Sequence, residues 1–170
     1  MNNIKLIVLD VDGVLTNGTI AINEDGTEHR NFNVKDGLGI FLWKKSGKEI
    51  GVISGRKGKL VEKRLQQLGI STYMLGVQKK GPAIEEMSNT LGFSLSEVAF
   101  MGDDLNDLPA INRVNRSFSP ADSVEEVKRA VNNITKSKGG YGAVREMIEI
   151  LLKENKQWDP LVKNFTEEEN

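Results

Sequence analysis

Three short apolar runs, each ending abruptly in a polar turn, constrain the fold more than any other feature of this sequence. Residues 4–9 end at Asp10, residues 49–53 end at Ser54, and residues 98–101 end at Gly102. Runs of this length that are apolar almost throughout are typical of parallel strands buried on both faces. The sequence therefore predicts three strands of a parallel sheet.

Helical patterns separate or follow these runs. Apolar residues recur at helical spacing in residues 38–45, 60–68, 84–91 and 141–152. Alternation of strands and helices predicts an α/β fold, a doubly wound parallel sheet with a Rossmann-like core. Such sheets bind ligands outside the carboxyl ends of their strands, so we expect the three polar turns to meet at one crevice.

Two segments depart from the alternation. Residues 17–32, with a turn at Asp25-Gly26, predict a β-hairpin inserted after the first strand. Residues 156–170 combine Trp158 and Phe165 with a terminal acidic run, so we expect a tail that docks on the surface and ends in disorder. We therefore expect one domain over residues 1–155, with the hairpin as a flap, and a C-terminal tail.

The composition excludes several classes of function. The 170 residues contain no Cys and only one His, which rules out a thiol nucleophile and a typical zinc site. A net charge of −1 without a dense basic cluster argues against a nucleic-acid partner. The apolar runs are too short to span a bilayer and the N-terminus does not look like a signal peptide, so we expect a cytoplasmic protein with no membrane partner.

Carboxylates gather at two of the predicted strand ends. Asp10 and Asp12 follow the first run, and Asp103, Asp104 and Asp107 follow the third. Two like charges about 4 Å apart repel by roughly 4 kcal/mol at an effective dielectric near 20, so ionised together these acids need a cation. Oxygen donors alone favour Mg²⁺ first and Mn²⁺ second. One of the first two acids can then act as nucleophile or metal ligand while the other donates a proton.

Positive charge for an anionic substrate is available nearby. Ser54, with backbone N–H groups such as that of Gly55 at the start of the following helix, can bind phosphate oxygens, and Arg56 is adjacent. Lys80 can neutralise a phosphate and a nucleophile together. The sequence has none of the glycine-rich nucleotide-binding motifs, so these residues indicate cleavage of a phosphate ester rather than nucleotide binding.

Each of these residues also has a simpler interpretation. Asp10 and Asp12 can be solvated acids in a turn, and Ser54 can be only a helix N-cap. Lys80 stands next to another lysine on what can be a solvated face. Arg64 lies in a helix of mixed charge, where an exposed arginine is the usual outcome.

The combined order of these residues resembles a known superfamily. Haloacid dehalogenase-type phosphohydrolases have four motifs, to which this chain offers Asp10-x-Asp12, Ser54, Lys80 and Gly102-Asp103-Asp104-x-x-Asp107. The resemblance implies an aspartyl-phosphate mechanism in which Asp10 attacks phosphorus and Asp12 is the general acid and then the base. Ser54 and Lys80 would hold the phosphoryl group. Mg²⁺ would bind Asp10, Asp103 and the backbone carbonyl of Asp12, with Asp104 and Asp107 in its outer shell.

Three further segments narrow the resemblance. Residues 32–37, 54–57 and 139–146 are similar to those of the capless 3-deoxy-D-manno-octulosonate 8-phosphate phosphatases. That family implies hydrolysis of this eight-carbon sugar acid phosphate for lipopolysaccharide synthesis, without a cap domain. It also implies a homotetramer in which the hairpin covers the neighbouring active site, and a tail that can enter the site. Gly55, Arg56 and Arg64 would contact the substrate.

Two other functions remain open at this point. Relatives that act on nine-carbon ulosonate 9-phosphates carry an acidic residue where this chain has Arg56 and a basic one where it has Gln67, so both positions favour the eight-carbon substrate. A non-catalytic relative that only binds Mg²⁺ is the other alternative. The full set of motif residues argues against it.

Overall fold

A six-stranded parallel sheet forms the centre of the molecule. The computed structural model describes residues 4–167, and within them the strands lie in the order β5-β4-β1-β6-β7-β8. All five pairings are parallel, which confirms the predicted doubly wound α/β fold. The strands are β1 (Leu6–Leu9), β4 (Glu49–Ser54), β5 (Thr72–Leu75), β6 (Val98–Met101), β7 (Arg116–Ser119) and β8 (Asn133–Ile134).

Strand β1 lies in the middle of the sheet and is apolar because both of its faces are covered. Its four residues are buried. Ile7 and Leu9 pack into one hydrophobic core, whereas Leu6 and Val8 pack into a second, as the alternation of side chains along a strand requires. This double burial explains why the run shows no polar alternation.

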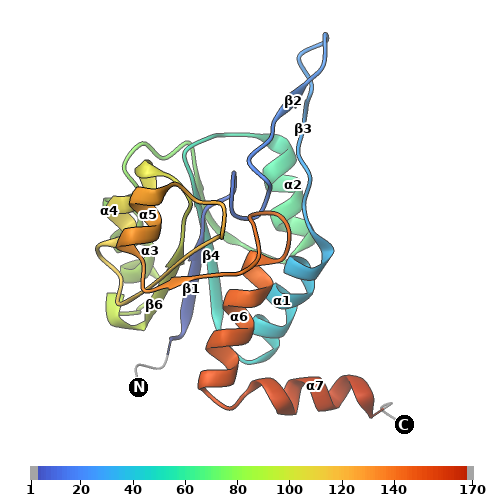
Figure 1. Ribbon diagram of the computed structural model, residues 1–170, viewed down its shortest axis with the longest axis vertical. Helices are drawn as coiled ribbons and strands as arrows, with labels where there is room; N and C mark the ends of the chain where they lie inside the picture. The colour runs from blue at the N-terminus through green and yellow to red at the C-terminus, as the bar shows by residue number, and fades with distance from the viewer. Residues whose placement is uncertain (1–3, 168–170) are drawn as a thin grey trace.

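Helices cover both faces of the sheet (Figure 1). The first core is completed by α1 (Val34–Lys45), α2 (Lys59–Gln67) and α6 (Ala143–Glu154). The second is completed by α3 (Lys80–Thr90), α4 (Leu108–Ile111) and α5 (Glu125–Ala130). Two short 3₁₀ helices, η1 (Leu95–Glu97) and η2 (Leu105–Asp107), flank β6. Among residues 4–167, no helix has the length and apolar character needed to cross a membrane.

Two helices begin four residues earlier than their apolar spacing predicts. Helix α1 starts at Val34, where Asn33 caps it by accepting a hydrogen bond from the Lys35 N–H at 2.8 Å. Helix α3 starts at Lys80. Apolar periodicity gives little signal for these turns, because Val34 is the one apolar residue among residues 34–37 and Lys80 is polar although buried.

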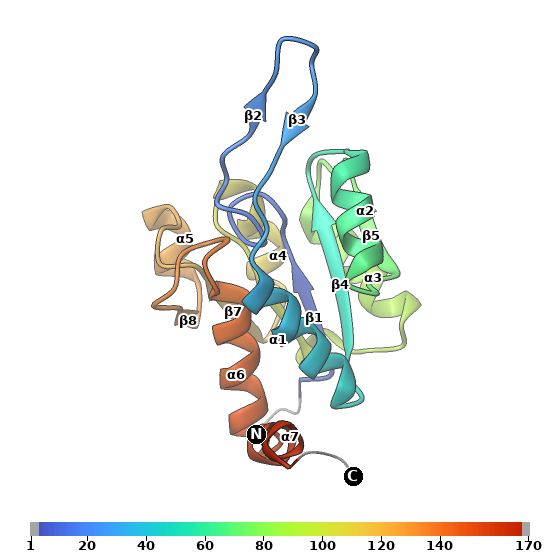
Figure 2. The same ribbon diagram turned by 90° about the vertical axis from the view of Figure 1, so that its right-hand side faces the viewer.

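The predicted hairpin after β1 is confirmed. Strands β2 (Ala21–Ile22) and β3 (Glu28–His29) pair antiparallel, and an antiparallel bridge joins Thr16 to Phe32 at the base. Figures 1 and 2 show the hairpin projecting well beyond the body of the molecule. Most of its residues are accordingly exposed.

The segment after α6 forms a helix. Helix α7 (Trp158–Thr166) places Leu161 in the first core, where the side chain is buried. The charged groups of Arg145 and Lys153 lie 5.0 and 5.3 Å from the Trp158 ring centroid, a cation–π arrangement that helps to hold α7. The predicted docking of the tail is thus seen for α7, whereas the predicted disorder concerns residues 168–170, which lie outside the described residues.

Candidate active site

The three polar strand ends lie side by side because β4, β1 and β6 are neighbours in the sheet. Leu9 is in register with Val52 of β4 and Met101 of β6, so β1 and β6 end at one level and β4 continues two residues further, to Ser54. A pocket of about 220 Å³ opens at this edge. Seven predicted site residues line it: Asp10, Asp12, Ser54, Gly55, Arg56, Asp103 and Asp104.

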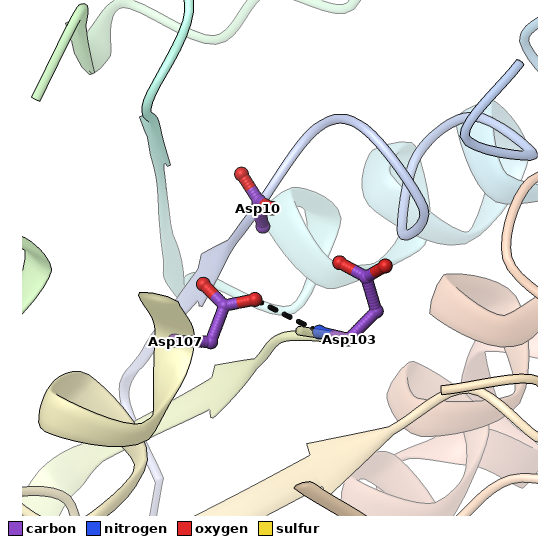
Figure 3. A group of neighbouring side chains, drawn as sticks. All are labelled: Asp10, Asp103 and Asp107. Atoms are coloured by element: carbon purple, nitrogen blue, oxygen red, sulfur yellow. Dashed lines mark hydrogen bonds between the residues drawn. The ribbon is translucent and has the colours of Figure 1, made fainter. Parts of the chain in front are cut away.

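Three carboxylates converge at the floor of this region (Figure 3). Asp10, Asp103 and Asp107 each offer an oxygen, and these oxygens lie within 4.8 Å of one another. Asp10 follows β1, Asp103 follows β6 and Asp107 ends η2, so the cluster joins two adjacent strand ends. Oxygen donors at this spacing suit a hard divalent cation.

Lys80 lies beneath the cluster and supplies its only nearby cation among the ion pairs of residues 4–167. Its side chain is 1% exposed, and its Nζ lies 2.9 Å from Asp10 Oδ1 and 2.5 Å from Asp107 Oδ1. Burial opposes the charged ammonium, but the attraction of Asp10 and Asp107 outweighs it and raises the pKa of Lys80. Lys80 is therefore a fixed positive charge at the start of α3.

One ammonium does not balance the charge of three carboxylates, and the pKa values of two of them are raised. Burial raises the pKa of Asp10 to about 7. Repulsion from Asp107 adds to this rise, whereas the attraction of Lys80 opposes it. Burial, with repulsion from Asp10 and Asp107, raises the pKa of Asp103 to about 8. Asp103 Oδ1 is also buried without a hydrogen-bond partner. These residues fit a Mg²⁺ ion, which would supply the missing charge and a ligand partner for that oxygen.

Asp107 and Asp104 are engaged differently from Asp10 and Asp103. Asp107 Oδ2 accepts hydrogen bonds from the backbone N–H groups of Asp103 and Asp104 at 2.9 and 3.2 Å, while its other oxygen accepts from Lys80. Asp104 Oδ1 accepts from the Leu105 N–H at 2.7 Å and caps η2. Asp107 thus braces the loop that carries Asp103, and Asp104 lies at the pocket wall.

Glycines allow the loops at this edge to approach closely. Gly13 has a φ of +85°, and a Cβ there would lie 2.0 Å from Asp103 Oδ2. A Cβ on Gly139 would lie 1.8 Å from the Gly13 carbonyl oxygen, and the Gly140 N–H donates to the Val14 carbonyl at 3.0 Å. The loop after β1 is therefore packed between the Asp103 loop and the segment that precedes α6.

Asp12 is held by an arginine that sequence reasoning missed. Arg30 Nε donates to Asp12 Oδ1 at 2.8 Å, and Arg30 Nη1 donates to Glu28 Oε2 at 2.7 Å. Glu28 Oε1 in turn lies 3.6 Å from Arg56 Nη2. The available signal was the spacing of Glu28 and Arg30, two residues apart and so on one face of a strand. Gly18 and Asn106 also line the pocket without having been predicted.

Ser54 and Arg64 have contrasting positions. Ser54 ends β4, is buried, and accepts a hydrogen bond on Oγ from the Arg56 N–H at 3.3 Å, so it faces the turn that lines the pocket. Arg64 is not among the residues lining that pocket. Its guanidinium lies 5.6 Å from the Phe32 ring centroid, and a Cβ on Gly37 would lie 3.2 Å from its Nη2. Its contact with substrate stays a prediction.

Comparisons with known proteins agree with this geometry. A family model described as haloacid dehalogenase-like hydrolase matches residues 76–148. The 3-deoxy-D-manno-octulosonate 8-phosphate phosphatase of Haemophilus influenzae is 37% identical over 152 residues, covering 89% of this chain and 84% of the relative. The Escherichia coli K12 phosphatase of the same name is 41% identical over 150 residues, covering 88% of this chain and 80% of the relative.

Solved structures are similar over nearly the whole chain. The Moraxella catarrhalis 3-deoxy-D-manno-octulosonate 8-phosphate phosphatase, in complex with magnesium ion, phosphate ion and a KDO molecule, superimposes with a TM-score of 0.94 at 38% identity. The superposition covers 96% of this chain and 94% of that one. A structure from Pseudomonas syringae, described as a probable yrbi family phosphatase, gives a TM-score of 0.96 at 38% identity, covering 99% and 96% of the two chains.

Proposed function

Because the chain belongs to the 3-deoxy-D-manno-octulosonate 8-phosphate phosphatase family of haloacid dehalogenase-like hydrolases, we propose that it hydrolyses this sugar acid phosphate to KDO and phosphate. The observation that carries the proposal is the group of Asp10, Lys80 and Asp103 at the edge of the sheet, beside the pocket lined by Asp12 and Ser54. Nucleophile, proton donor, cation ligand and fixed positive charge are all supplied there by this chain.

Magnesium is the cofactor that the donor set fits. The carboxylates of Asp10 and Asp103 and the backbone carbonyl of Asp12 would hold the ion, with Asp104 and Asp107 acting through water or through the loop backbone. When bound, Mg²⁺ neutralises charge on the phosphate and on the nucleophile, so that the two anions can approach each other. The phosphatase of Moraxella catarrhalis, crystallised with magnesium and phosphate, supports this choice.

The reaction proceeds in two displacements. An Asp10 carboxylate oxygen attacks phosphorus, the bond from phosphorus to the sugar oxygen breaks, and Asp12 gives its proton to that departing oxygen. Water then attacks the aspartyl phosphate, Asp12 accepts the proton of the water, and phosphate leaves Asp10 free. Lys80 lies close enough to Asp10 to hold its reacting carboxylate in place, and Ser54 binds phosphoryl oxygens.

We assign substrate selection to the part of the pocket that is lined by Arg56 and Gly55. Arg56 and Gly55 line it beside Ser54, so we place the sugar acid carboxylate or hydroxyls near Arg56, whose planar fork suits a carboxylate. Arg64 would contribute from the adjoining helix, by holding Phe32 and the start of α1 or by direct contact with the sugar.

A homotetramer and a cytoplasmic location complete the proposal. The hairpin projects away from the body of its own subunit (Figure 2), so its tip is placed to reach another molecule. A neighbour's hairpin would then cover each pocket and limit which sugars enter. A sugar phosphate substrate, with no nucleic-acid or membrane partner, accords with an enzyme of the cytoplasm.

A phosphate-release assay tests the function. Purified protein with Mg²⁺ is given the eight-carbon 8-phosphate, a nine-carbon ulosonate 9-phosphate and a panel of other phosphomonoesters, and kcat/KM is compared before and after Arg56→Glu. We expect preference for the eight-carbon substrate, reduced in the variant. Preference for the nine-carbon substrate in the unmodified protein would reject the assignment, and inactivity on every ester would favour a binding role alone.

A further inference from the structure

Arg30 is a buried cation that the proposed reaction leaves without a role. It follows β3 at the base of the hairpin, and its side chain is 1% exposed. Its guanidinium donates from two different nitrogens to two different carboxylates, Asp12 at 2.8 Å and Glu28 at 2.7 Å. Burial of such a group is expensive unless it is paired, so this arrangement is a built feature and not a surface ion pair.

The contacts form a chain of alternating charge across the pocket wall. Asp12 pairs with Arg30, Arg30 with Glu28, and Glu28 lies 3.6 Å from Arg56. Each acidic side chain of this set therefore lies beside at least one basic side chain. Removing Arg30 would leave Asp12 and Glu28 unbalanced and would free the Asp12 side chain to turn away from the pocket.

We propose that Arg30 is a positioning residue for Asp12, holding the carboxyl group where it can give its proton to the departing sugar oxygen. The inference rests on the proposed function, because it assigns Arg30 a role through the acid of that reaction. Nε fixes one Asp12 oxygen and leaves the other free to face the substrate. The planar guanidinium is locked in turn by Glu28, so the direction of the Asp12 side chain is set by a rigid partner and not by solvent.

The same contact joins the flap to the chemistry. Arg30 lies one residue beyond β3, and the bridge between Thr16 and Phe32 closes the hairpin just below it. A displacement of the hairpin base therefore moves Arg30, and with it the proton donor. The acid is correctly placed only when the base of the flap is in the position seen in the structure.

The dependence of activity on the leaving group distinguishes a positioning role of Arg30 from a role in supporting the fold. A sugar alkoxide leaves poorly without a proton, whereas p-nitrophenolate is a stable anion that leaves readily without one. The quantity to compare is kcat/KM, which reports the step in which Asp10 is phosphorylated and the leaving group departs. A variant with a misplaced acid should lose activity on the sugar phosphate and keep it on p-nitrophenyl phosphate.

The experiment uses the full chain with Mg²⁺, four single variants and one double variant that combines Arg30→Met with Asp12→Asn. Arg30→Met keeps an unbranched side chain and removes its charge. Arg30→Lys keeps the charge but loses the planar group that donates from two nitrogens. Asp12→Asn shows the leaving-group pattern expected of a lost acid. Arg116→Met is the matched control, because Arg116 pairs with Glu154 at 2.6 Å and is not among the residues lining the pocket.

General acids contribute about 10²–10⁴-fold, so we expect Arg30→Met to lower kcat/KM for the sugar phosphate by at least about tenfold and for p-nitrophenyl phosphate by less than about threefold. In Arg30→Lys, the ratio of kcat/KM on the sugar phosphate to kcat/KM on p-nitrophenyl phosphate should lie between those of the unmodified protein and Arg30→Met. Arg116→Met should leave both values unchanged. Adding Arg30→Met to Asp12→Asn should cause no further loss on the sugar phosphate, because Arg30 acts through Asp12.

The outcomes distinguish this inference from the proposed function. If the unmodified protein releases no phosphate from the eight-carbon substrate, the proposed function fails before any variant is compared. If it does release phosphate and Arg30→Met lowers both activities equally, or lowers the Asp12→Asn rate further, the positioning role is wrong while the function stands. A thermal unfolding curve for each variant shows whether an equal loss comes from unfolding.

Discussion

At the scale of single residues, the carboxyl groups of Asp10 and Asp103 have too few protein partners to balance their charge and are suited to a bound cation. Asp103 has one buried oxygen without a hydrogen bond, and the one ammonium that pairs with Asp10 among residues 4–167 is shared with Asp107. In the absence of metal these groups hold protons far above the pH at which an exposed aspartate loses them. Their protonation should therefore couple metal binding to pH.

Stability in the absence of metal should fall as pH rises. The pKa of Asp103 is raised, mainly by burial, from 3.8 to about 8, so the folded chain retains a proton that the unfolded chain releases near pH 4. The stabilisation from this group is complete below pH 4 and is lost as pH rises toward 8. Thermal unfolding in chelator should show a lower Tm at pH 8 than at pH 5.

Magnesium should reverse this trend. The ion competes with protons for the same oxygens, so it should raise Tm more at pH 8 than at pH 5. At a hundred times its Kd, bound Mg²⁺ stabilises the folded chain by about 2.7 kcal/mol. Asp103→Asn should reduce both the pH slope and the shift with magnesium. A shift of equal size at both pH values would contradict the assignment of the metal to this cluster.

Asp10→Asn should separate catalysis from stability. Loss of the nucleophile should lower kcat by on the order of 10⁴-fold or more. The amide removes a buried carboxylate whose pKa is about 7, so in chelator at pH 8 the variant should be more stable, with about 2–4 °C in Tm for each kcal/mol. Phosphate release and calorimetry measure the two effects. Retained activity would mean that water attacks phosphorus directly.

The residues whose position the sequence predicted are those with a recognisable local pattern around them. Asp10 and Asp103 directly follow apolar strands, and a strand end in a parallel sheet is a recognisable place for a ligand. Arg30 lacks such a signal, because its partner Asp12 is 18 residues away and only the folded hairpin brings the two together. Arg64 had a plausible helix position, yet packs against Phe32.

At the scale of elements, the loop after β1 depends on a neighbour from the far end of the chain. The segment that precedes α6 presses against it at Gly13 and Gly139. Asp36 of α1 accepts from the Arg145 N–H in the first turn of α6 at 2.9 Å, and Asn33 Nδ2 donates to the Gly140 carbonyl of the preceding segment at 3.2 Å. Helices α1 and α6 thus support the loop that carries Asp12 through the contacts of Gly139 and Gly140.

Gly139→Ala should disturb this support. The added Cβ would lie 1.8 Å from a backbone oxygen, which cannot move without shifting the Asp12 loop. Overpacking of this kind costs typically 1–3 kcal/mol, and kcat should fall as well because the proton donor moves. Gly58→Ala is the control, since a Cβ there meets only Arg30 Nη1 at 3.9 Å. Equal Tm and kcat for both variants would show that the contact is not tight.

The elements predicted from the sequence are those with a strong apolar signal. Strands β1, β4 and β6 were expected because central strands are buried on both faces. Strands β5, β7 and β8 were not, because β5 is only half-buried along its length and the Arg-Ser-Phe-Ser sequence of β7 has one apolar residue. The first turns of α1 and α3 were not predicted either, because each contains few apolar residues.

At the scale of the whole molecule, apolar side chains remain on one face of α1. Val34, Leu38 and Phe41 stand at helical spacing and are 80%, 43% and 52% exposed. Residues four and three apart lie on one side of a helix, so they form a stripe of a kind that is more usual at subunit contacts than on free surfaces. The stripe supports the proposed association of four chains.

Phe41→Glu should weaken that association. Burying a Phe side chain contributes about 1.5–3 kcal/mol, so a carboxylate in its place should shift tetramers toward smaller species at low concentration. Light scattering over a dilution series measures the change. Lys63→Glu introduces a carboxylate at an exposed position of α2, away from the stripe, and should have little effect. A monomeric unmodified protein would remove the proposal of a neighbour-supplied flap.

The hairpin is paired through only two residues on each strand beyond its base bridge, and this economy has an evolutionary consequence. Changes in its tip touch neither hydrophobic core and leave the reacting groups where the sheet puts them. Under the proposed arrangement, in which a neighbour's hairpin covers each pocket, a lineage can exchange tip residues that would contact the sugar while keeping the groups that break its ester bond. Substrate range can then change by mutation without loss of the reaction.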